Sequence, residues 1–261
     1  MKTALITGAS GGIGYELAKV FAANGWDLIL TARSGSKLKE FGEGLSSRHG
    51  IAVHILAKDL AEPQAAEELF REISAKSWHV DALVNNAGIG SFGFFSETDL
   101  LLESRLLELN ITSLTKLTKL FLKPMTERRE GYILNVASTA AFLPGPLMAV
   151  YYASKAYVLS FSEALADEVE PLGVRVTALC PGATETGFQD AAKMRSSKLF
   201  KNHAMSAAQV ASEGYQGMIR GKRIVIPGVK NRVMVASVRF VPRRLVTKVV
   251  RKIQEVDKSA K

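Results

Sequence analysis

The amino-acid sequence predicts a single α/β domain, built on a doubly wound parallel sheet of about seven strands with helices on both faces. Two observations carry this prediction. Short apolar runs alternate with longer amphipathic stretches along most of the chain. Hydrophobic residues make up 47% of the 261 residues, enough for one large buried core. Regular alternation of this kind is typical of parallel sheets, because parallel neighbours need a crossover connection that is usually a helix.

Each predicted element has its own signal. Short apolar runs predict strands at residues 3–7, 27–31, 52–56, 82–85, 132–136, 175–179 and 223–226. Amphipathic periodicity predicts helices near residues 12–24, 36–48, 62–77, 98–129, 150–170 and 206–220. Ligands of such sheets bind beyond the carboxyl ends of the strands. The residues that follow each strand are therefore the candidates for function.

A glycine-rich turn follows the first predicted strand. The segment TGASGGIG places Gly8, Gly12 and Gly14 between that strand and an amphipathic helix. Glycines allow the backbone to approach a pyrophosphate, and the start of the helix offers free N–H groups and a positive dipole end. A plain steric turn is the alternative, but the strand–turn–helix context favours a nucleotide site.

The end of the second predicted strand indicates which nucleotide would bind. It reads Leu30-Thr31-Ala32-Arg33-Ser34 and carries no carboxylate. An NAD site needs an acidic residue there to accept hydrogen bonds from the ribose. Arg33 instead offers a planar cation suited to a 2′-phosphate. The sequence thus predicts NADP(H), with an ordinary surface arginine as the alternative.

Three residues predict acid–base chemistry at the same edge of the sheet. Tyr151 and Lys155 are four apart in a predicted helix, so they share one face. A free phenol has a pKa of about 10. A neighbouring lysine ammonium, together with a positively charged oxidised nicotinamide, would favour the phenolate and bring its pKa towards the range useful for catalysis. Ser138 follows the fifth strand, where its hydroxyl could donate to a carbonyl oxygen as charge develops there. A lone Tyr-x-x-x-Lys is common by chance, and the combination makes the signal specific.

These motifs together resemble those of the short-chain dehydrogenase/reductase family, in its compact single-domain subgroup, over roughly residues 1–228. The motifs are TGASGGIG, Asn85-Asn86-Ala87-Gly88, Ser138, Tyr151-Tyr152-Ala153-Ser154-Lys155 and Pro181-Gly182. The resemblance implies a Rossmann fold and an NADP(H)-dependent oxidoreductase that transfers hydride between the nicotinamide and a carbonyl or alcohol. Two alternatives stay open: an epimerase or dehydratase with a retained cofactor, and a non-enzymatic NADP(H)-binding sensor or scaffold.

The resemblance also implies roles for individual residues. Asn110, Ser138, Tyr151 and Lys155 would be catalytic: Tyr151 the acid, Ser138 the group that positions the carbonyl, and Lys155 a holder of the nicotinamide ribose. Asn110 would bend its helix and hold a water molecule. Contacts with the cofactor are expected from Gly8, Ser10, Gly12, Ile13, Gly14, Arg33, Asp59, Leu60, Asn86, Ala87, Gly88, Tyr151, Lys155, Pro181, Gly182, Thr184 and Thr186.

Apolar residues are placed to flank a substrate pocket. They occur in the segment 187–205, which includes Phe188, Met194, Leu199 and Phe200, in the segment 140–148, and at Phe92, Phe94 and Phe95. Such a pocket favours a lipophilic ketone, aldehyde or alcohol over a sugar or a charged acid. Core packing of the same aromatic residues is the alternative.

The C-terminal extension, residues 229–261, departs from the compact pattern because it is basic and amphipathic. Residues 221–252 contain ten Lys and Arg and no Asp or Glu, although the whole chain has a net charge of only +9. Pro242 predicts a helix start, with Leu245, Val246, Val249, Val250 and Ile253 on one face. This face could pack on its own subunit, on an oligomer partner or on an anionic membrane. Nucleic-acid binding is not expected, since no reader motif is present.

The composition also bears on metal binding and on cellular location. Cys180 is the only cysteine, and the four histidines lack metal-ligand spacing, so no metal site is expected. Without an apolar run long enough to span a bilayer, we expect a cytoplasmic protein, peripherally bound to a membrane if the extension docks on one. The family resemblance implies a dimer or tetramer.

Overall fold

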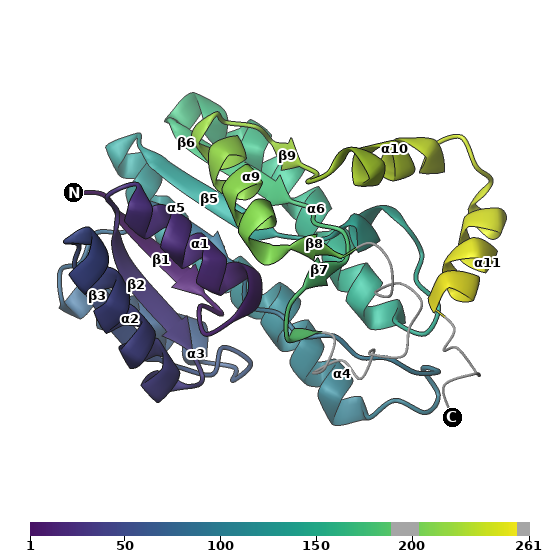
Figure 1. Ribbon diagram of the computed structural model, residues 1–261, viewed down its shortest axis with the longest axis horizontal. Coiled ribbons are helices and arrows are strands. Elements are labelled where there is room, and N and C mark those ends of the chain that lie inside the picture. Colours follow the sequence, from purple (N-terminus) through teal and green to yellow (C-terminus); the bar gives the residue numbers. More distant parts are fainter. Residues whose placement is uncertain (189–203, 255–261) are drawn as a thin grey trace.

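The computed structural model describes residues 1–188 and 204–254, and its centre is a parallel sheet with the strand order β3-β2-β1-β4-β5-β6-β9 (Figure 1). The strands are β1 (Thr3–Thr7), β2 (Asp27–Ala32), β3 (Val53–Ala57), β4 (Ala82–Asn85), β5 (Gly131–Val136), β6 (Val174–Leu179) and β9 (Ile224–Val225). The predicted doubly wound parallel sheet is therefore confirmed. The order reverses between β1 and β4, and such a switch point leaves a crevice at the carboxyl ends of the strands.

Helices cover both faces of the sheet. They are α1 (Gly12–Ala23), α2 (Gly35–His49), α3 (Ala65–Ala75), α4 (Leu100–Leu107), α5 (Leu114–Arg128), α6 (Ala149–Val169) and α9 (Ala207–Ile219). Alternation along β1 shows how the two layers form, because neighbouring strand residues point to opposite faces. Ile6 packs in one buried cluster with residues of α1, α2 and α9, whereas Leu5 packs in another with residues of α3, α5 and α6.

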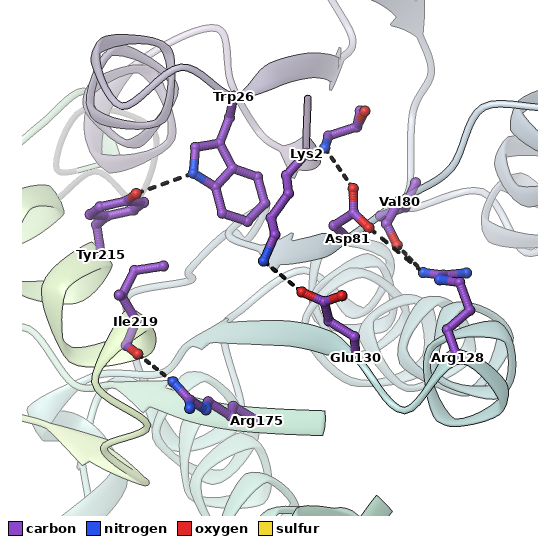
Figure 2. A network of polar contacts seen from close by, with 10 residues as sticks. Lys2, Trp26, Val80, Asp81, Arg128, Glu130, Arg175, Tyr215 and Ile219 are labelled. Atoms are coloured by element: carbon purple, nitrogen blue, oxygen red, sulfur yellow. Dashed lines mark hydrogen bonds and ion pairs between the residues drawn. The ribbon is translucent and has the colours of Figure 1, made fainter. Parts of the chain in front are cut away.

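A network of polar contacts joins the amino ends of the strands, at the edge of the sheet opposite the carboxyl ends (Figure 2). Asp81 Oδ2 accepts a hydrogen bond of 2.8 Å from the Thr3 backbone N–H, and Lys2 Nζ lies 2.6 Å from Glu130 Oε1. The hydrogen bond from Lys2 lowers the pKa of Glu130. Because both side chains of this ion pair are largely exposed, the pair contributes at most about 1 kcal/mol to stability.

Buried amides link the centre of the sheet to the helices beside it. Asn85 Nδ2 donates to Asn135 Oδ1 at 2.9 Å and to Thr118 Oγ1 at 3.0 Å, and Asn135 Nδ2 donates to Ser162 Oγ at 2.9 Å. All four side chains are buried. A buried polar group costs free energy unless it is hydrogen-bonded. Each side chain of this hydrogen-bonded network therefore depends on the others for its partners.

Replacing Asn135 by Ala is therefore expected to destabilise the protein by about 2 kcal/mol, because it leaves donors and acceptors without partners in the core. Thermal unfolding would report this as a fall in Tm of roughly 4–8 °C. Asn24→Ala is the matched control, since Asn24 Nδ2 makes a single exposed hydrogen bond to the Val20 carbonyl. Equal falls in Tm in the two variants would contradict a structural role for the buried hydrogen-bonded network.

The C-terminal residues form two helices beyond the sheet, α10 (Val229–Val238) and α11 (Arg243–Gln254), at the right of Figure 1. The predicted helix α11 begins directly after Pro242. Val246 and Val250 of this helix are buried in a cluster with Met148 and Tyr152. The sequence left open whether this helix packs on its own subunit, on an oligomer partner or on a membrane. One side of α11 packs on its own subunit. The division of the chain at residue 228 stays a prediction.

Several element predictions differ from the structure. The helix predicted over 98–129 is divided into α4, a π-helical segment η1 (Glu108–Ser113) and α5. The short pair β7 (Thr184–Glu185) and β8 (Met205–Ser206) and the helix α10 were not predicted. The two strands are too short to give a sequence pattern. Helix α10 has one buried residue, Val235, so it lacks a clear apolar face. Among the described residues, no helix is both long enough and apolar enough to cross a membrane.

Candidate active site

The glycine turn after β1 is closely packed against the turn after β4. Gly8 has a φ of 66°, and a Cβ built there would lie 2.8 Å from Asn86 Nδ2. A Cβ on Gly14 would lie 2.5 Å from the Gly8 carbonyl oxygen and would overlap Asn86 Nδ2. Asn86 Nδ2 donates to the Thr7 carbonyl at 2.8 Å, which holds the two turns together. Both positions therefore require glycine.

The start of α1 is left open towards the carboxyl edge of the sheet. Its N-cap residue, Gly11, supplies no side-chain hydrogen bond, so the first N–H groups of the helix have no cap. Gly12, with a φ of 55°, faces Thr186, whose Cβ would lie 3.1 Å from a Cβ at position 12. Ser10 is exposed and Ile13 half-buried at this edge. Uncapped N–H groups beside a positive dipole end suit an anion such as a diphosphate.

Arg33 lies directly after β2, as predicted. Its side chain is exposed, and among residues 1–188 and 204–254 no partner for it is found. A cation without a partner at this edge suits a phosphate group. Asp59, after β3, is instead held by a 2.7 Å ion pair with Arg105 and by a 3.0 Å hydrogen bond from the Ala61 N–H. Leu60 is buried in the core, so only its backbone is placed to flank a ligand.

The segment after β4 forms one wall of the same crevice. Thr7 Oγ1 accepts hydrogen bonds of 2.9 Å from the N–H groups of both Asn86 and Ala87. A Cβ built on Gly88 would lie 3.2 Å from Asn110 Oδ1 and 3.6 Å from Lys155 Nζ. The backbone of this wall thus passes directly over two of the predicted catalytic residues. The sequence analysis missed Thr7, whose hydroxyl accepts from this turn and donates to the Val84 carbonyl at 3.2 Å.

The π-helical segment η1 positions Asn110. A π turn inserts an extra residue into a helix and occurs frequently at functional sites. Asn110 Nδ2 donates to the Ile89 carbonyl at 3.0 Å and to Ser154 Oγ at 3.1 Å, while its Oδ1 accepts from the Ile89 N–H at 3.0 Å. The side chain is buried, and its contacts tie the turn after β4 to helix α6. The sequence analysis missed Ser154, which stands next to Lys155 in the sequence.

Ser138, Tyr151 and Lys155 come together at the carboxyl end of β5. Ser138 lies near Tyr151, whose pKa it lowers, and its Oγ donates a 3.3 Å hydrogen bond to the Pro181 carbonyl. Lys155 Nζ donates to the Val136 carbonyl at 2.8 Å and lies 5.8 Å from the centre of the Tyr151 ring. All three catalytic side chains predicted at this edge are therefore neighbours, with Asn110 reaching them through Ser154.

Burial controls the protonation of this group. It raises the pKa of Tyr151 above its usual range, and the nearby Ser138 hydroxyl offsets only part of this effect. Burial also lowers the pKa of Lys155 to about 8. Burial therefore favours the protonated form of Tyr151, the form that acts as an acid. The sequence prediction that Lys155, together with an oxidised nicotinamide, favours the phenolate stays a prediction.

Tyr151 packs against an apolar cluster. The Phe188 ring lies 5.3 Å from the Tyr151 ring, and Met148, Phe92 and Leu143 belong to the same cluster. Phe94 and Phe95, expected to flank the pocket, are exposed, because the chain turns outward after Phe92. Met194, Leu199 and Phe200 lie outside the described residues.

Helix α11 completes this cluster, a contribution that the sequence analysis missed. Gln254 Nε2 donates to the Tyr152 hydroxyl at 2.5 Å, and both side chains are buried. The two residues are 102 positions apart, and no local pattern signals such a pair. This contact also occupies the hydroxyl of Tyr152.

The turn after β6 closes the crevice on its remaining side. The Pro181 carbonyl accepts a 2.8 Å hydrogen bond from the Thr139 N–H. A Cβ on Gly182 would lie 2.6 Å from the Asn231 side chain of α10. Thr184 is buried, with Oγ1 3.0 Å from the Gly182 carbonyl. Within the described ranges no group of three His, Cys, Asp or Glu side chains could hold a metal ion.

A family model described as short chain dehydrogenase matches residues 2–196. The chain belongs to the short-chain dehydrogenase family. This is a family of oxidoreductases, and the match includes the glycine turn, Ser138, Tyr151 and Lys155.

Curated relatives from eukaryotes share about a third of their residues with the chain. A short chain dehydrogenase of Pseudocercospora fijiensis is 36% identical over 71% of this chain and 60% of its own length. The dehydrogenase/reductase SDR family member 7B of Mus musculus is 32% identical over 85% and 72%. A very-long-chain 3-oxoacyl-CoA reductase of Pyrenophora tritici-repentis is 39% identical over 66% and 52%. The match thus spans only about half to three quarters of these relatives.

Solved structures of dehydrogenases share the fold over nearly the whole chain. A short-chain dehydrogenase from Sphingobium yanoikuyae in complex with NADPH has a TM-score of 0.84 and 28% identity, and the alignment covers 100% of this chain and 98% of that one. An alcohol dehydrogenase from Comamonas testosteroni, specific for bulky-bulky ketones, has a TM-score of 0.78 and 27% identity over 92% of both chains. A family member from Burkholderia phymatum in complex with NAD has a TM-score of 0.80 and 25% identity over 91% and 92%.

Proposed function

We propose that this protein is an NADP(H)-dependent carbonyl reductase or alcohol dehydrogenase that acts on a lipophilic ketone, aldehyde or alcohol, with Tyr151 as the acid and base. The observation that carries the proposal is the position of the Tyr151 hydroxyl. Tyr151 has Ser138 close to its hydroxyl and Lys155 Nζ 5.8 Å from the centre of its ring, and it packs in an apolar cluster. A protonated phenol in such surroundings can give its proton to a neighbouring oxygen atom that becomes negatively charged during the reaction.

The side chains divide the work of carbonyl reduction between them. When bound, the nicotinamide supplies the hydride. Ser138 donates a hydrogen bond to the carbonyl oxygen and orients it, and this bond strengthens as negative charge develops on that oxygen. Tyr151 Oη transfers its proton to the same oxygen, which yields the alcohol. Lys155, held by the Val136 carbonyl, would bind the ribose hydroxyls, and Asn110 holds the wall over it.

Three features at the carboxyl edge of the sheet support binding of a dinucleotide. Gly8 and Gly14 leave room that a side chain would fill, the start of α1 is uncapped, and Arg33 is without a partner among the described residues. Solved relatives include a complex with NADPH and another with NAD, so the choice of NADP(H) rests on Arg33. Asn86, Ala87, Gly88, Thr184 and Thr186 would line the same crevice.

The apolar cluster supports a lipophilic substrate. Phe188, Phe92, Met148 and Leu143 belong to one apolar cluster with Tyr151. One relative is named for very-long-chain 3-oxoacyl-CoA and one solved structure for bulky ketones. We therefore expect turnover to rise with the apolar bulk of the substrate. A dimer or tetramer and a cytoplasmic location remain predictions of the family resemblance and of the sequence.

Oxidation of NADPH by the purified protein, with ketones and aldehydes graded in lipophilicity, tests the proposal. We expect turnover that rises with lipophilicity and that stops when the carbonyl compound is omitted. Binding of NADPH without turnover of any compound in the series would contradict the assigned reaction and favour a sensor. Highest turnover with small polar carbonyls would contradict the assigned substrate class.

Replacing Arg33 by Ser is expected to raise KM for NADPH about 10–100-fold, because a hydrogen bond between charged groups contributes about 1.5–3 kcal/mol. KM for NADH should change little, since NADH carries no 2′-phosphate. Steady-state kinetics with both cofactors measure this difference. Arg71→Ser, which removes an exposed arginine of α3, is the matched control. A wild-type enzyme that uses NADH as well as NADPH would show that Arg33 does not select the cofactor.

A further inference from the structure

Helix α11 presents a second apolar row that the protein leaves exposed. Leu245, Val249 and Ile253 recur every four residues and so lie along one side of the helix. They are 53%, 51% and 41% exposed, whereas Val246, Val250 and Gln254, one position further along, point inward and are buried. Only half of the apolar face of α11 is therefore used in packing.

A basic row runs along the other flank of these residues. Arg244, Lys248 and Lys252 each precede a member of the exposed apolar row by one position and are themselves exposed. Residues 229–254 contain eight Lys and Arg and no Asp or Glu. We call the two rows together the outer face of α11: Arg244, Leu245, Lys248, Val249, Lys252 and Ile253.

Aromatic residues extend the exposed apolar surface next to this helix. The Arg251 guanidinium lies 5.4 Å from the centre of the Phe94 ring, which places the loop after β4 beside α11. Phe94 and Phe95 are both exposed, and Phe240, just before α11, is 87% exposed. Aromatic and aliphatic residues beside cations are typical of helices that lie in the interface of a membrane.

We propose that the outer face of α11 docks the protein on an anionic phospholipid bilayer. Leu245, Val249 and Ile253 would enter the boundary between headgroups and acyl chains, while Arg244, Lys248 and Lys252 meet the phosphates. Dimerisation through this face is disfavoured, because two identical basic faces would repel each other across a symmetry axis. Helix α11 lies at the margin of the molecule, beyond the sheet (Figure 1).

The opposite side of α11 connects this surface to the candidate active site. Val246 and Val250 pack in the cluster that contains Tyr151 and Phe188, and Gln254 bonds to Tyr152. Docking would thus bring the apolar pocket to the bilayer, where lipophilic carbonyl compounds are concentrated. This link to the substrate rests on the proposed function, whereas docking itself does not.

Co-sedimentation of the full chain with lipid vesicles tests the proposal. The wild-type protein should sediment with vesicles that contain phosphatidylserine, but not with phosphatidylcholine alone, and high salt should release it. The variant Arg244→Gln/Lys248→Gln/Lys252→Gln should bind about 100-fold more weakly, since each basic residue near an anionic surface contributes about a factor of five. The variant Leu245→Ser/Val249→Ser/Ile253→Ser should also lose most of its binding.

The control variant Lys39→Gln/Lys119→Gln/Lys123→Gln removes the same charge from α2 and α5 and should bind like wild type. Equal losses in the two charge variants, or no binding by wild type, would overturn the proposal. A change of oligomeric state in the serine variant without vesicles would also overturn it, by showing that the face joins two subunits. NADPH oxidation is measured separately, so a protein that docks without turnover would refute the proposed function alone.

Discussion

Replacing Tyr151 by Phe is expected to lower kcat by roughly three orders of magnitude, because it removes the proton that the reaction requires. The change deletes one oxygen atom and leaves the ring in place against Phe188. The dissociation constant for NADPH should therefore change little. Steady-state kinetics and a separate titration with NADPH, followed by protein fluorescence, measure the two quantities.

Tyr152→Phe is the matched control, since it also removes one hydroxyl from the same cluster. That hydroxyl bonds to Gln254 and lies apart from Ser138 and Lys155, so the variant should lose some stability and keep most of its turnover. Similar losses of turnover in both variants would mean that packing of the cluster, and not the proton of Tyr151, controls the rate.

Gly14→Ala is expected to weaken NADPH binding about 10–100-fold and to lower Tm, because overpacking of a closely packed site costs about 1–3 kcal/mol. The added Cβ would stand 2.5 Å from the Gly8 carbonyl oxygen and would displace the Asn86 amide. The turn would have to open, and its N–H groups would no longer face one phosphate. Calorimetric titration with NADPH measures the affinity, and thermal unfolding measures the stability.

Gly11→Ala in the same turn provides the comparison. A Cβ on Gly11 has no neighbour within 4 Å, and the backbone there is extended, with a φ of 179°. Any residue can adopt that conformation, so this variant should fold like wild type and retain its affinity. If Gly11→Ala were as damaging as Gly14→Ala, the sequence of the whole turn, rather than the close contact with Asn86, would be responsible.

The order of elements and the location of the site were predictable from sequence because both follow from local patterns. Buried strands are apolar runs, and the residues that follow them must meet at one edge of a parallel sheet. Tyr151, Lys155 and Ser138 were placed together on this ground, and the structure brings them together. The burial of Tyr151, which raises its pKa, was not predicted, because it depends on the cluster around the ring and not on the spacing to Lys155.

Contacts between distant segments could not be predicted in this way. Gln254 and Tyr152 bond across 102 positions, and neither has a sequence neighbour that signals the pair. Helix α10 has little apolar periodicity, and it forms after Gly228, whose φ of 81° turns the chain away from the sheet. The π turn at Asn110 is a further case, since one additional residue in a helix leaves the apolar pattern on both sides nearly unchanged.

The central position of β1 has a consequence for any shortened version of the chain. β1 pairs with β2 on one side and with β4 on the other, where Ala4 meets Ala82. A fragment that stops before residue 82 would leave one edge of β1 unpaired, with Leu5 and Ile6 exposed there. Open edges of apolar strands recruit other strands and aggregate. Fragments meant for expression or for studies of partial folding therefore need to extend at least through β4.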